Sequence, residues 1–294
     1  MSRPHSRRRA LLGLSVAALC LSSLATHAWA EGYQKGPAPT AAALEQMGPY
    51  ALGTASLPAS SDYNNKTVIY YPNAAGAERF GLVVLCPGFV STGPLYAGVA
   101  QRIASHGFVV AQMNTKSLFD QPIARSQQIE AVMKAVLAQN QTAAVAFAGK
   151  VDGDRVAIMG HSAGGAGTFY AGARNPQVKA LVGLMAGQPS SDFAAFQGIR
   201  IPSLLITAEN DWLANSWSEP YYAQLPAGLP AALIEMQGMG HLSLWVTATQ
   251  TSQGRVAKYA TAWVKRFVDE DTRYTPFISA PAPDMSDFKR QGSY

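Results

Sequence analysis

Residues 154–173 carry the pattern that restricts the fold most: a short apolar segment, a tight turn rich in small residues, and a helix-compatible run. In the turn, Gly160 and Gly164 each lie two residues from Ser162. A residue at the tip of a strand-to-helix turn has strained and crowded backbone around it, which small neighbours allow. The pattern therefore predicts that Ser162 stands at the tip of such a turn, as a nucleophile does. A glycine-rich turn without chemistry is the alternative.

Apolar, β-branched segments alternate with helical patterns along the rest of the chain, which is typical of a mostly parallel sheet covered by helices on both faces. The predicted strands are residues 51–57, 67–71, 81–86, 108–113, 155–159, 180–185, 203–207 and 231–236. The predicted helices are residues 96–105, 127–138, 165–173, 219–224 and 256–267. About eight strands and a serine turn predict an α/β-hydrolase fold without a large lid. The polar and Pro-rich residues 31–40 and 275–294 are expected to wrap the surface.

The first thirty residues are predicted to form a signal peptide that is not part of the fold. Three arginines at 7–9 precede an apolar run at 10–25, and Ala28-Trp29-Ala30 fits a cleavage site. The arginines also fit a twin-arginine signal, so the export route stays open. A lipid anchor at Cys20 is disfavoured by bulky Leu19 before it. We expect a secreted or periplasmic protein without a membrane anchor.

The predicted mature chain, residues 31–294, keeps 264 of the 294 residues, a length that suits a single catalytic domain. Its leader takes four arginines away, so 19 of the 23 Lys and Arg residues remain, against 18 Asp and Glu. This near-neutral balance does not imply a nucleic-acid partner. Cys86 is then the one cysteine left, so no intramolecular disulfide can form. Its place at the end of an apolar run predicts a buried, unreactive thiol.

A serine needs a neighbouring base to become a strong nucleophile, and histidine is the usual one. Two of the five histidines lie in the leader, which leaves three candidates. His161 follows the first glycine of the turn, and its side chain should point away from the serine proton. His106 ends a predicted helix before an interior strand, where a structural role is expected. His241 lies in a loop after the last predicted strand, and by elimination it is the predicted base.

The third member of a catalytic triad is a carboxylate that orients the histidine, and it should follow a strand between the nucleophile and the base. The strand at 203–207 runs into Glu209 and Asp211. We prefer Asp211 and expect Glu209 to bind a nearby backbone amide instead. Asp192 and Glu235 have weaker positions, one in a polar loop and one inside a strand.

Hydrolysis of an ester also needs hydrogen-bond donors aimed at the oxyanion of the tetrahedral intermediate. The backbone N–H of Ala163, directly after the nucleophile, is one expected donor. A second should come from the loop after the third strand, residues 87–91, and the N–H of Phe89 is the candidate. The Phe89 ring would then lie over the acyl pocket, with core packing as the alternative.

Several segments resemble those of bacterial cutinases and the poly(ethylene terephthalate) (PET) hydrolases related to them. They are Gly36-Pro37-Ala38-Pro39-Thr40, Val68-Ile69-Tyr70-Tyr71-Pro72, Pro87-Gly88-Phe89, Ala104-Ser105-His106-Gly107-Phe108-Val109-Val110, Asp120-Gln121-Pro122, Gly160-His161-Ser162-Ala163-Gly164-Gly165, Glu209-Asn210-Asp211, Lys265-Arg266-Phe267 and Asp271-Thr272-Arg273-Tyr274. The resemblance spans nearly the whole predicted mature chain. It implies Ser162 as nucleophile, Asp211 as acid, His241 as base, and the amides of Phe89 and Ala163 as the oxyanion hole.

The chain departs from that family at positions that concern the substrate. The family usually has Met where this chain has Ala163, a Pro-Trp pair in the loop at 186–189, and a C-terminal cysteine pair, and the last two are missing here. Tryptophans near the predicted acid and base could supply a different aromatic wall, with loop packing as the alternative: Trp212, Trp217 and Trp245. The substrate contacts assigned are Phe89, His161, Trp212, Leu213 and Trp245.

These observations predict a secreted serine hydrolase that cleaves carboxylic esters, with polyesters such as cutin or PET as the favoured substrates. A lipase or carboxylesterase acting on small or acyl-glycerol esters is the alternative. A non-catalytic binding module on this fold is disfavoured because no triad residue is missing, and a peptidase because it would usually carry an extra domain. We expect a monomer that needs no cofactor and no metal.

Overall fold

The computed structural model describes residues 1, 33–58, 60–63, 67–187 and 194–294. The predicted signal peptide, with Cys20 and the cleavage site, lies outside the described residues apart from Met1, and so do Asp192 and part of the loop at 186–189. Among the described residues, no helix is long and apolar enough to cross a membrane.

The described strands form one sheet in the order β1-β2-β4-β3-β5-β6-β7-β8-β9. They are β1 (Leu52–Leu57), β2 (Thr67–Pro72), β3 (Phe80–Cys86), β4 (Phe108–Gln112), β5 (Val151–His161), β6 (Ala180–Leu184), β7 (Ser203–Ala208), β8 (Ala231–Met236) and β9 (Met285–Gln291). The six neighbours from β4 to β8 pair in parallel, whereas β1, β2 and β9 pair antiparallel with their neighbours. Because parallel strands end at the same edge, the loops after β3, β5, β7 and β8 meet there.

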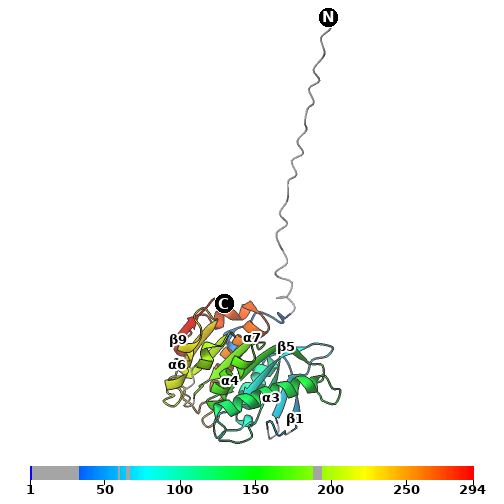
Figure 1. Ribbon diagram of the computed structural model, residues 1–294, viewed down its shortest axis with the longest axis horizontal. Helices are drawn as coiled ribbons and strands as arrows, with labels where there is room; N and C mark the ends of the chain where they lie inside the picture. The colour runs from blue at the N-terminus through cyan, green and yellow to red at the C-terminus, as the bar shows by residue number, and fades with distance from the viewer. Residues whose placement is uncertain (2–32, 59, 64–66, 188–193) are drawn as a thin grey trace.

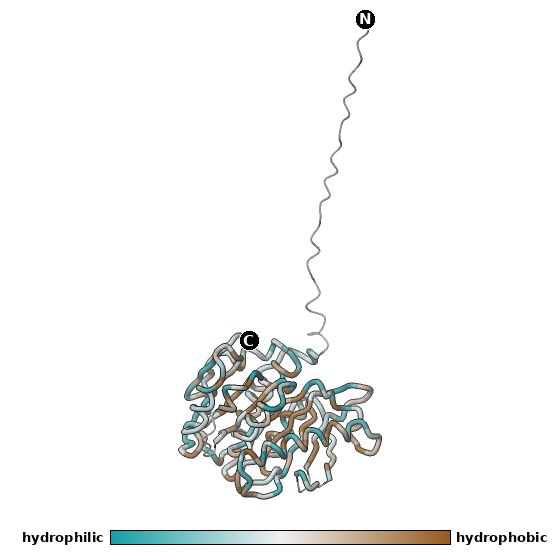
Figure 2. Tube along the Cα trace, in the orientation of Figure 1, coloured by the Kyte–Doolittle hydropathy of each residue, from teal (hydrophilic) through white to brown (hydrophobic). Residues whose placement is uncertain are grey.

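Helices cover both faces of the sheet (Figure 1). They are α1 (Ala41–Glu45), α2 (Ala97–Ser105), α3 (Pro122–Asn140), α4 (Ala163–Arg174), α5 (Ala194–Gln197), α6 (Asn215–Gln224) and α7 (Gln250–Val268), with 3₁₀ turns η1 (Gly93–Tyr96) and η2 (Thr272–Phe277). Along strands β2 to β8, neighbouring residues mostly belong to different cores. One core packs under α2 and α7, and the other under α3, α4 and α6. Figure 2 shows hydrophobic residues concentrated along the segments at the centre of the molecule.

The predicted α/β-hydrolase fold is confirmed, and each of the eight predicted strands is present with small shifts of its ends. The ninth strand, β9, was not predicted, because residues 275–294 were expected only to wrap the surface. Its sequence has two large apolar residues, Met285 and Phe288, and its side chains are half-buried or exposed. β9 forms by backbone pairing with the edge of β8. Pairing of this kind requires almost no hydrophobic pattern in the sequence of the added strand, so the sequence did not reveal it.

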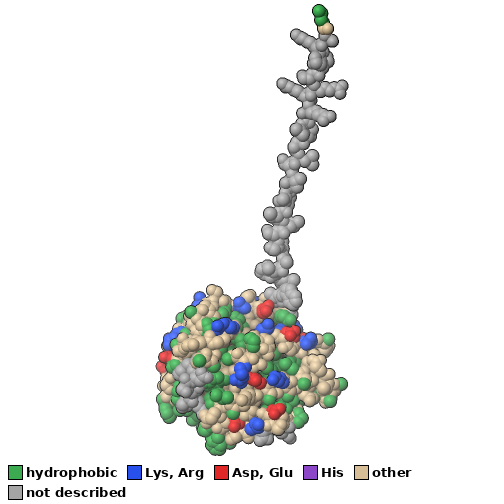
Figure 3. All heavy atoms as spheres, viewed as in Figure 1, with side chains coloured by type: hydrophobic (Ala, Val, Ile, Leu, Met, Phe, Trp, Pro, Cys, Tyr) green, Lys and Arg blue, Asp and Glu red, His purple; other side chains and the backbone are tan. Residues whose placement is uncertain are grey.

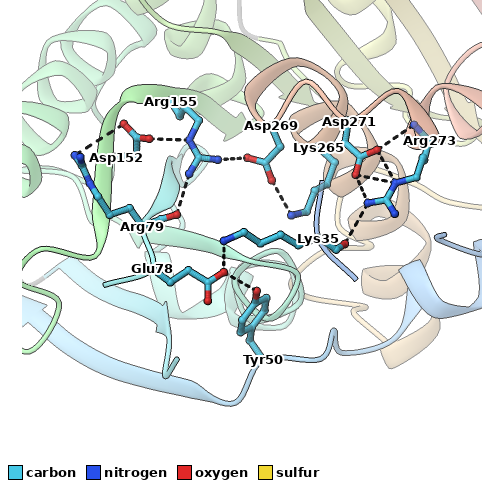
Figure 4. A network of polar contacts seen from close by, with 10 residues as sticks. All are labelled: Lys35, Tyr50, Glu78, Arg79, Asp152, Arg155, Lys265, Asp269, Asp271 and Arg273. Atoms are coloured by element: carbon cyan, nitrogen blue, oxygen red, sulfur yellow. Dashed lines mark hydrogen bonds and ion pairs between the residues drawn. The ribbon is translucent and has the colours of Figure 1, made fainter. Parts of the chain in front are cut away.

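A polar network closes the end of the sheet opposite the meeting loops (Figure 4). Asp269, after α7, accepts from Arg155 of β5 and from Lys265 of α7, both at 2.7 Å. Arg155 also donates to Asp152 at 3.0 Å. All four side chains are largely buried. This network joins α7 to the start of the central strands.

Cys86 ends β3 fully buried, and burial raises the pKa of its thiol to about 11, so the thiol is protonated near neutral pH. The predicted burial of Cys86 is confirmed.

On the face drawn in Figure 3, positive and negative side chains are interspersed, with no large patch of one sign.

Candidate active site

Ser162 stands at the tip of the turn between β5 and α4. Its backbone has φ 52° and ψ −121°, a left-handed conformation that is strained for a residue with a side chain. A β-carbon on Gly160 would collide with the Gly164 carbonyl oxygen, and one on Gly164 with the Pro87 carbonyl oxygen. The two glycines therefore allow the close approach of strand, helix and neighbouring loop. The strand–turn–helix predicted from the sequence is present, with Ser162 at 8% exposure.

Three side chains from the loops after β5, β7 and β8 form a hydrogen-bonded chain. His241 Nε2 lies 3.0 Å from Ser162 Oγ, and His241 Nδ1 lies 2.8 Å from Asp211 Oδ2. Because an ionised carboxylate can only accept, Nδ1 carries the ring proton and Nε2 is free to accept from the serine hydroxyl. The second oxygen of Asp211 accepts from the backbone N–H groups of Leu213 and Ala214, at 3.0 and 2.8 Å. The buried carboxylate is thus held from both sides.

Two other carboxylates and one other histidine that the sequence offered for the triad make their hydrogen bonds outside it. Glu209 accepts from the backbone N–H of Gly238 at 2.7 Å, which is the kind of contact expected for it. Glu235 lies within β8 and accepts from Ser286 at 2.8 Å. His106 is buried, and its Nε2 lies 3.3 Å from the Gln46 carbonyl oxygen. The structure therefore brings Asp211 and not these groups to His241.

The loop after β3 is pressed against the turn. A β-carbon on Gly88 would lie 2.8 Å from His161 Nδ1 and 3.1 Å from the Ser162 β-carbon. Within the part of the chain that the structure describes, the backbone N–H groups of Phe89 and Ala163 make no hydrogen bond. Two free donors next to Ser162 are what an oxyanion hole requires.

Arg125 holds this loop, and sequence reasoning missed it. Its guanidinium is fully buried in α3 and donates to the carbonyl oxygens of Pro87 at 3.0 Å, Leu118 at 3.0 Å and Asp120 at 2.7 Å. Arginine at a helix position usually predicts an exposed side chain, so the sequence carries no local signal of this role. Thr115 Oγ1 is a fourth acceptor, at 3.4 Å, and the contact with Pro87 forms only because the fold brings that loop to α3.

The predicted substrate contacts divide into groups. Trp212, 87% exposed, and Leu213 line an open pocket of about 330 Å³ that His241 also lines. The ring of Phe89 is half-buried and meets Phe119 edge to face, with centroids 5.7 Å apart. Trp245 is half-buried outside that pocket's lining. The ring of Trp217 packs against the core beside Gly187, which is the packing alternative considered for it.

His161 is buried, in contact with neighbouring side chains. Its two ring nitrogens lie near the Tyr96 hydroxyl and the His241 carbonyl oxygen. Among the described residues, no group of three or more His, Cys, Asp or Glu side chains is placed to hold a metal ion.

Comparison with known proteins places the chain among enzymes of one kind. A family model described as PET hydrolase-like matches residues 27–292. The chain belongs to this family. It is 33% identical to the bis(hydroxyethyl) terephthalate hydrolase of Streptomyces coelicolor over 290 residues, which cover 95% of this chain and 89% of the relative. It is 35% identical to Cutinase 2 of Thermobifida cellulosilytica over 259 residues, 86% of this chain and 93% of the relative. The resemblance predicted from the motifs is confirmed.

Proposed function

We propose that the protein is a carboxylic ester hydrolase that works through an acyl-enzyme, with Ser162 as nucleophile, His241 as base and Asp211 as orienting acid. The observation that carries the proposal is the order of contacts, serine hydroxyl to imidazole to carboxylate, at the carboxyl edge of the sheet. Membership of the PET hydrolase-like family supports the same reaction.

The geometry supports a two-step reaction. Ser162 Oγ attacks the ester carbonyl carbon while His241 Nε2 takes its proton, and the Phe89 and Ala163 amides stabilise the oxyanion. When the intermediate collapses, the alcohol leaves with the proton from His241. A water then attacks the acyl-enzyme by the same route, giving the carboxylic acid and free serine. Asp211 holds the imidazole in the required tautomer and stabilises its protonated form.

A polyester is the substrate that the surface supports best. Exposed apolar side chains lie at the loop that carries Phe89 and at the pocket that His241 lines. Val90 belongs to the oxyanion loop and Leu118 and Phe119 contact it, and Trp212, Leu213 and Leu242 line the pocket beside His241. An exposed apolar surface of this kind marks a binding site for an apolar partner. A chain of ester units lying across both groups would place one ester at the serine.

Product analysis on three ester classes tests the proposal. Purified protein and its Ser162→Ala variant are given p-nitrophenyl acetate, tributyrin and an aromatic polyester film, and acids and alcohols released are measured by chromatography. We expect release from all three by the unmodified protein and from none by the variant. Hydrolysis of tributyrin without attack on the film would favour the lipase or carboxylesterase alternative. No hydrolysis of any ester would contradict the proposal itself.

We also propose export, with cleavage after Ala30 and a monomeric single domain at residues 31–294. The Arg-rich start, the apolar run and the Ala-Trp-Ala site support this. The mass and N-terminal sequence of the protein recovered outside the cytoplasm test the cleavage, and light scattering tests the monomer.

A further inference from the structure

Two buried aromatic side chains lie behind the triad without touching the pocket beside it. Tyr96, at the end of η1, and His161, at the end of β5, are each 1% exposed. The Tyr96 hydroxyl lies 2.8 Å from His161 Nδ1, and His161 Nε2 lies 3.1 Å from the His241 carbonyl oxygen. At this depth neither side chain offers a surface to a substrate, so any part they take in the reaction acts through their neighbours.

The acceptors determine where the hydrogens lie. A carbonyl oxygen only accepts, so His161 Nε2 must carry the ring proton. In the neutral ring Nδ1 then accepts, and the Tyr96 hydroxyl donates to it. The same hydroxyl oxygen accepts from the backbone N–H of Gly88 at 3.3 Å. A one-directional chain of hydrogen bonds therefore runs from Gly88 through Tyr96 and His161 to His241.

This chain joins the three segments that the reaction has to hold in register. Gly88 precedes Phe89, whose amide is one of the two proposed oxyanion donors. His161 precedes Ser162 in the strained turn. The carbonyl of His241 belongs to the residue that carries the base. Two side chains thus link the oxyanion loop, the serine turn and the base loop.

The neutral state of His161 also matters to its neighbour. The rings of His161 and His241 have centroids 4.8 Å apart, and a cation at His161 would oppose the charge that His241 acquires during the reaction. Burial holds the pKa of His161 well below its ordinary value, and His241 beside it acts in the same direction. The other groups near this pair are Arg125, which is charged, and Cys86, whose thiol is protonated near neutral pH.

We propose that Tyr96 and His161 are positioning residues for ester hydrolysis: their hydrogen bonds align the oxyanion loop and the backbone of His241 with Ser162. The inference rests on the proposed function, because it assigns both residues a part in that reaction. They touch neither substrate nor reacting atoms, so their effect should fall on kcat and leave KM nearly unchanged. A displacement of about 1 Å in a catalytic group can cost roughly a hundredfold in rate.

Steady-state kinetics on p-nitrophenyl acetate with paired variants tests this. Tyr96→Phe keeps the ring and removes the hydroxyl, and we expect kcat to fall about 10- to 100-fold with KM within about twofold. His161→Phe removes both ring contacts and should lose as much. His161→Gln restores an N–H donor toward the His241 carbonyl and cannot ionise, so it should recover most of the rate. Thermal melts show whether each variant is folded.

A pH profile separates positioning from mere packing. If His161 stays neutral throughout, His161→Gln leaves the midpoint of the acid limb of kcat/KM where it is in the unmodified protein. A shifted midpoint, or wild-type kcat in folded Tyr96→Phe, would overturn the inference. Unmodified protein and Ser162→Ala are run alongside. Loss of the difference between these two would contradict the proposed function instead, so the two failures are distinguishable.

Discussion

The Arg125 guanidinium donates to the Pro87 carbonyl oxygen at 3.0 Å, so a cation fully buried in α3 holds the loop that carries Phe89. Its other acceptors are the carbonyl oxygens of Leu118 and Asp120 and, at 3.4 Å, the Thr115 hydroxyl, so the charge is shared between the loop after β3 and the segment before α3. A lysine has one compact ammonium and cannot reach all of them.

Arg125→Lys should therefore lower both stability and activity. Each hydrogen bond to a charged group contributes about 1.5–3 kcal/mol, so we expect a loss of about 2–4 kcal/mol in the free energy of unfolding. Urea denaturation measures this, and p-nitrophenyl acetate turnover should fall with it. Arg200→Lys is the matched control, because Arg200 is exposed and also donates to backbone carbonyls. Equal effects of the two changes would rule out a special role for Arg125.

The proposed triad predicts unequal losses among its members. Ser162→Ala and His241→Ala should each lower kcat by on the order of a millionfold, since they act as one unit. Asp211→Asn should cost roughly ten-thousandfold, because it mainly spoils the tautomer. Glu209→Gln is the control, and we expect little change in kcat, since Glu209 binds the Gly238 amide. If Glu209→Gln were as damaging as Asp211→Asn, the assignment of the acid would be wrong.

His106 should make the folded state sensitive to acid. Burial lowers the pKa of its imidazole to about 4, with Lys265 adding to the shift. Between this value and the ordinary 6.5, the unfolded chain binds a proton that the folded chain does not, so stability falls as the pH falls through that window. The linkage amounts to about 2 kcal/mol between pH 7 and pH 5. The free energy of unfolding of His106→Gln should change less over this interval than that of the unmodified protein. An identical pH dependence in both would contradict the assignment.

Asp269 should contribute much more to the free energy of unfolding than a surface carboxylate does. It compensates two largely buried cations, so Asp269→Asn removes the carboxylate that pairs with Lys265 and leaves Arg155 with Asp152 alone (Figure 4). Breaking a buried pair costs about 3–5 kcal/mol. Glu219→Gln is the control, because its pair with Lys289 is exposed and should be worth about 0–1 kcal/mol. Denaturant unfolding of both variants at neutral pH makes the comparison, and a loss below 1 kcal/mol for Asp269→Asn would refute it.

The sequence predicted the strands, the serine turn and the three side chains that the structure joins, because each of these leaves a local pattern. Ser162 needs glycines at fixed positions, and His241 was found because few histidines remained once the leader was set aside. Arg125 and Tyr96 leave no such pattern, since the contacts that link them to the site, with Pro87 and His161, come from segments far along the chain. Spacing along the chain also could not show which of Trp212 and Trp245 lines the pocket beside His241. Trp212 is almost fully exposed and lines the pocket beside His241, whereas Trp245 is half-buried and does not line that pocket.

Phe89 and Trp212 are the aromatic side chains expected to hold the acyl group. Trp212 lines the pocket that includes His241, and Phe89 lies at the oxyanion loop against Phe119. Aromatic contacts contribute about 0.5–1.5 kcal/mol beyond buried area, enough to change kcat/KM several-fold. Phe89→Ala and Trp212→Ala should therefore slow hydrolysis of bulky aromatic esters several-fold more than that of p-nitrophenyl acetate, because the Phe89 backbone amide survives the change. Trp245→Ala, outside the pocket lining, is the control and should affect both esters alike. Equal losses on small and bulky esters for Phe89→Ala and Trp212→Ala would mean that these rings support their loops, and the aromatic polyester would lose its main physical support.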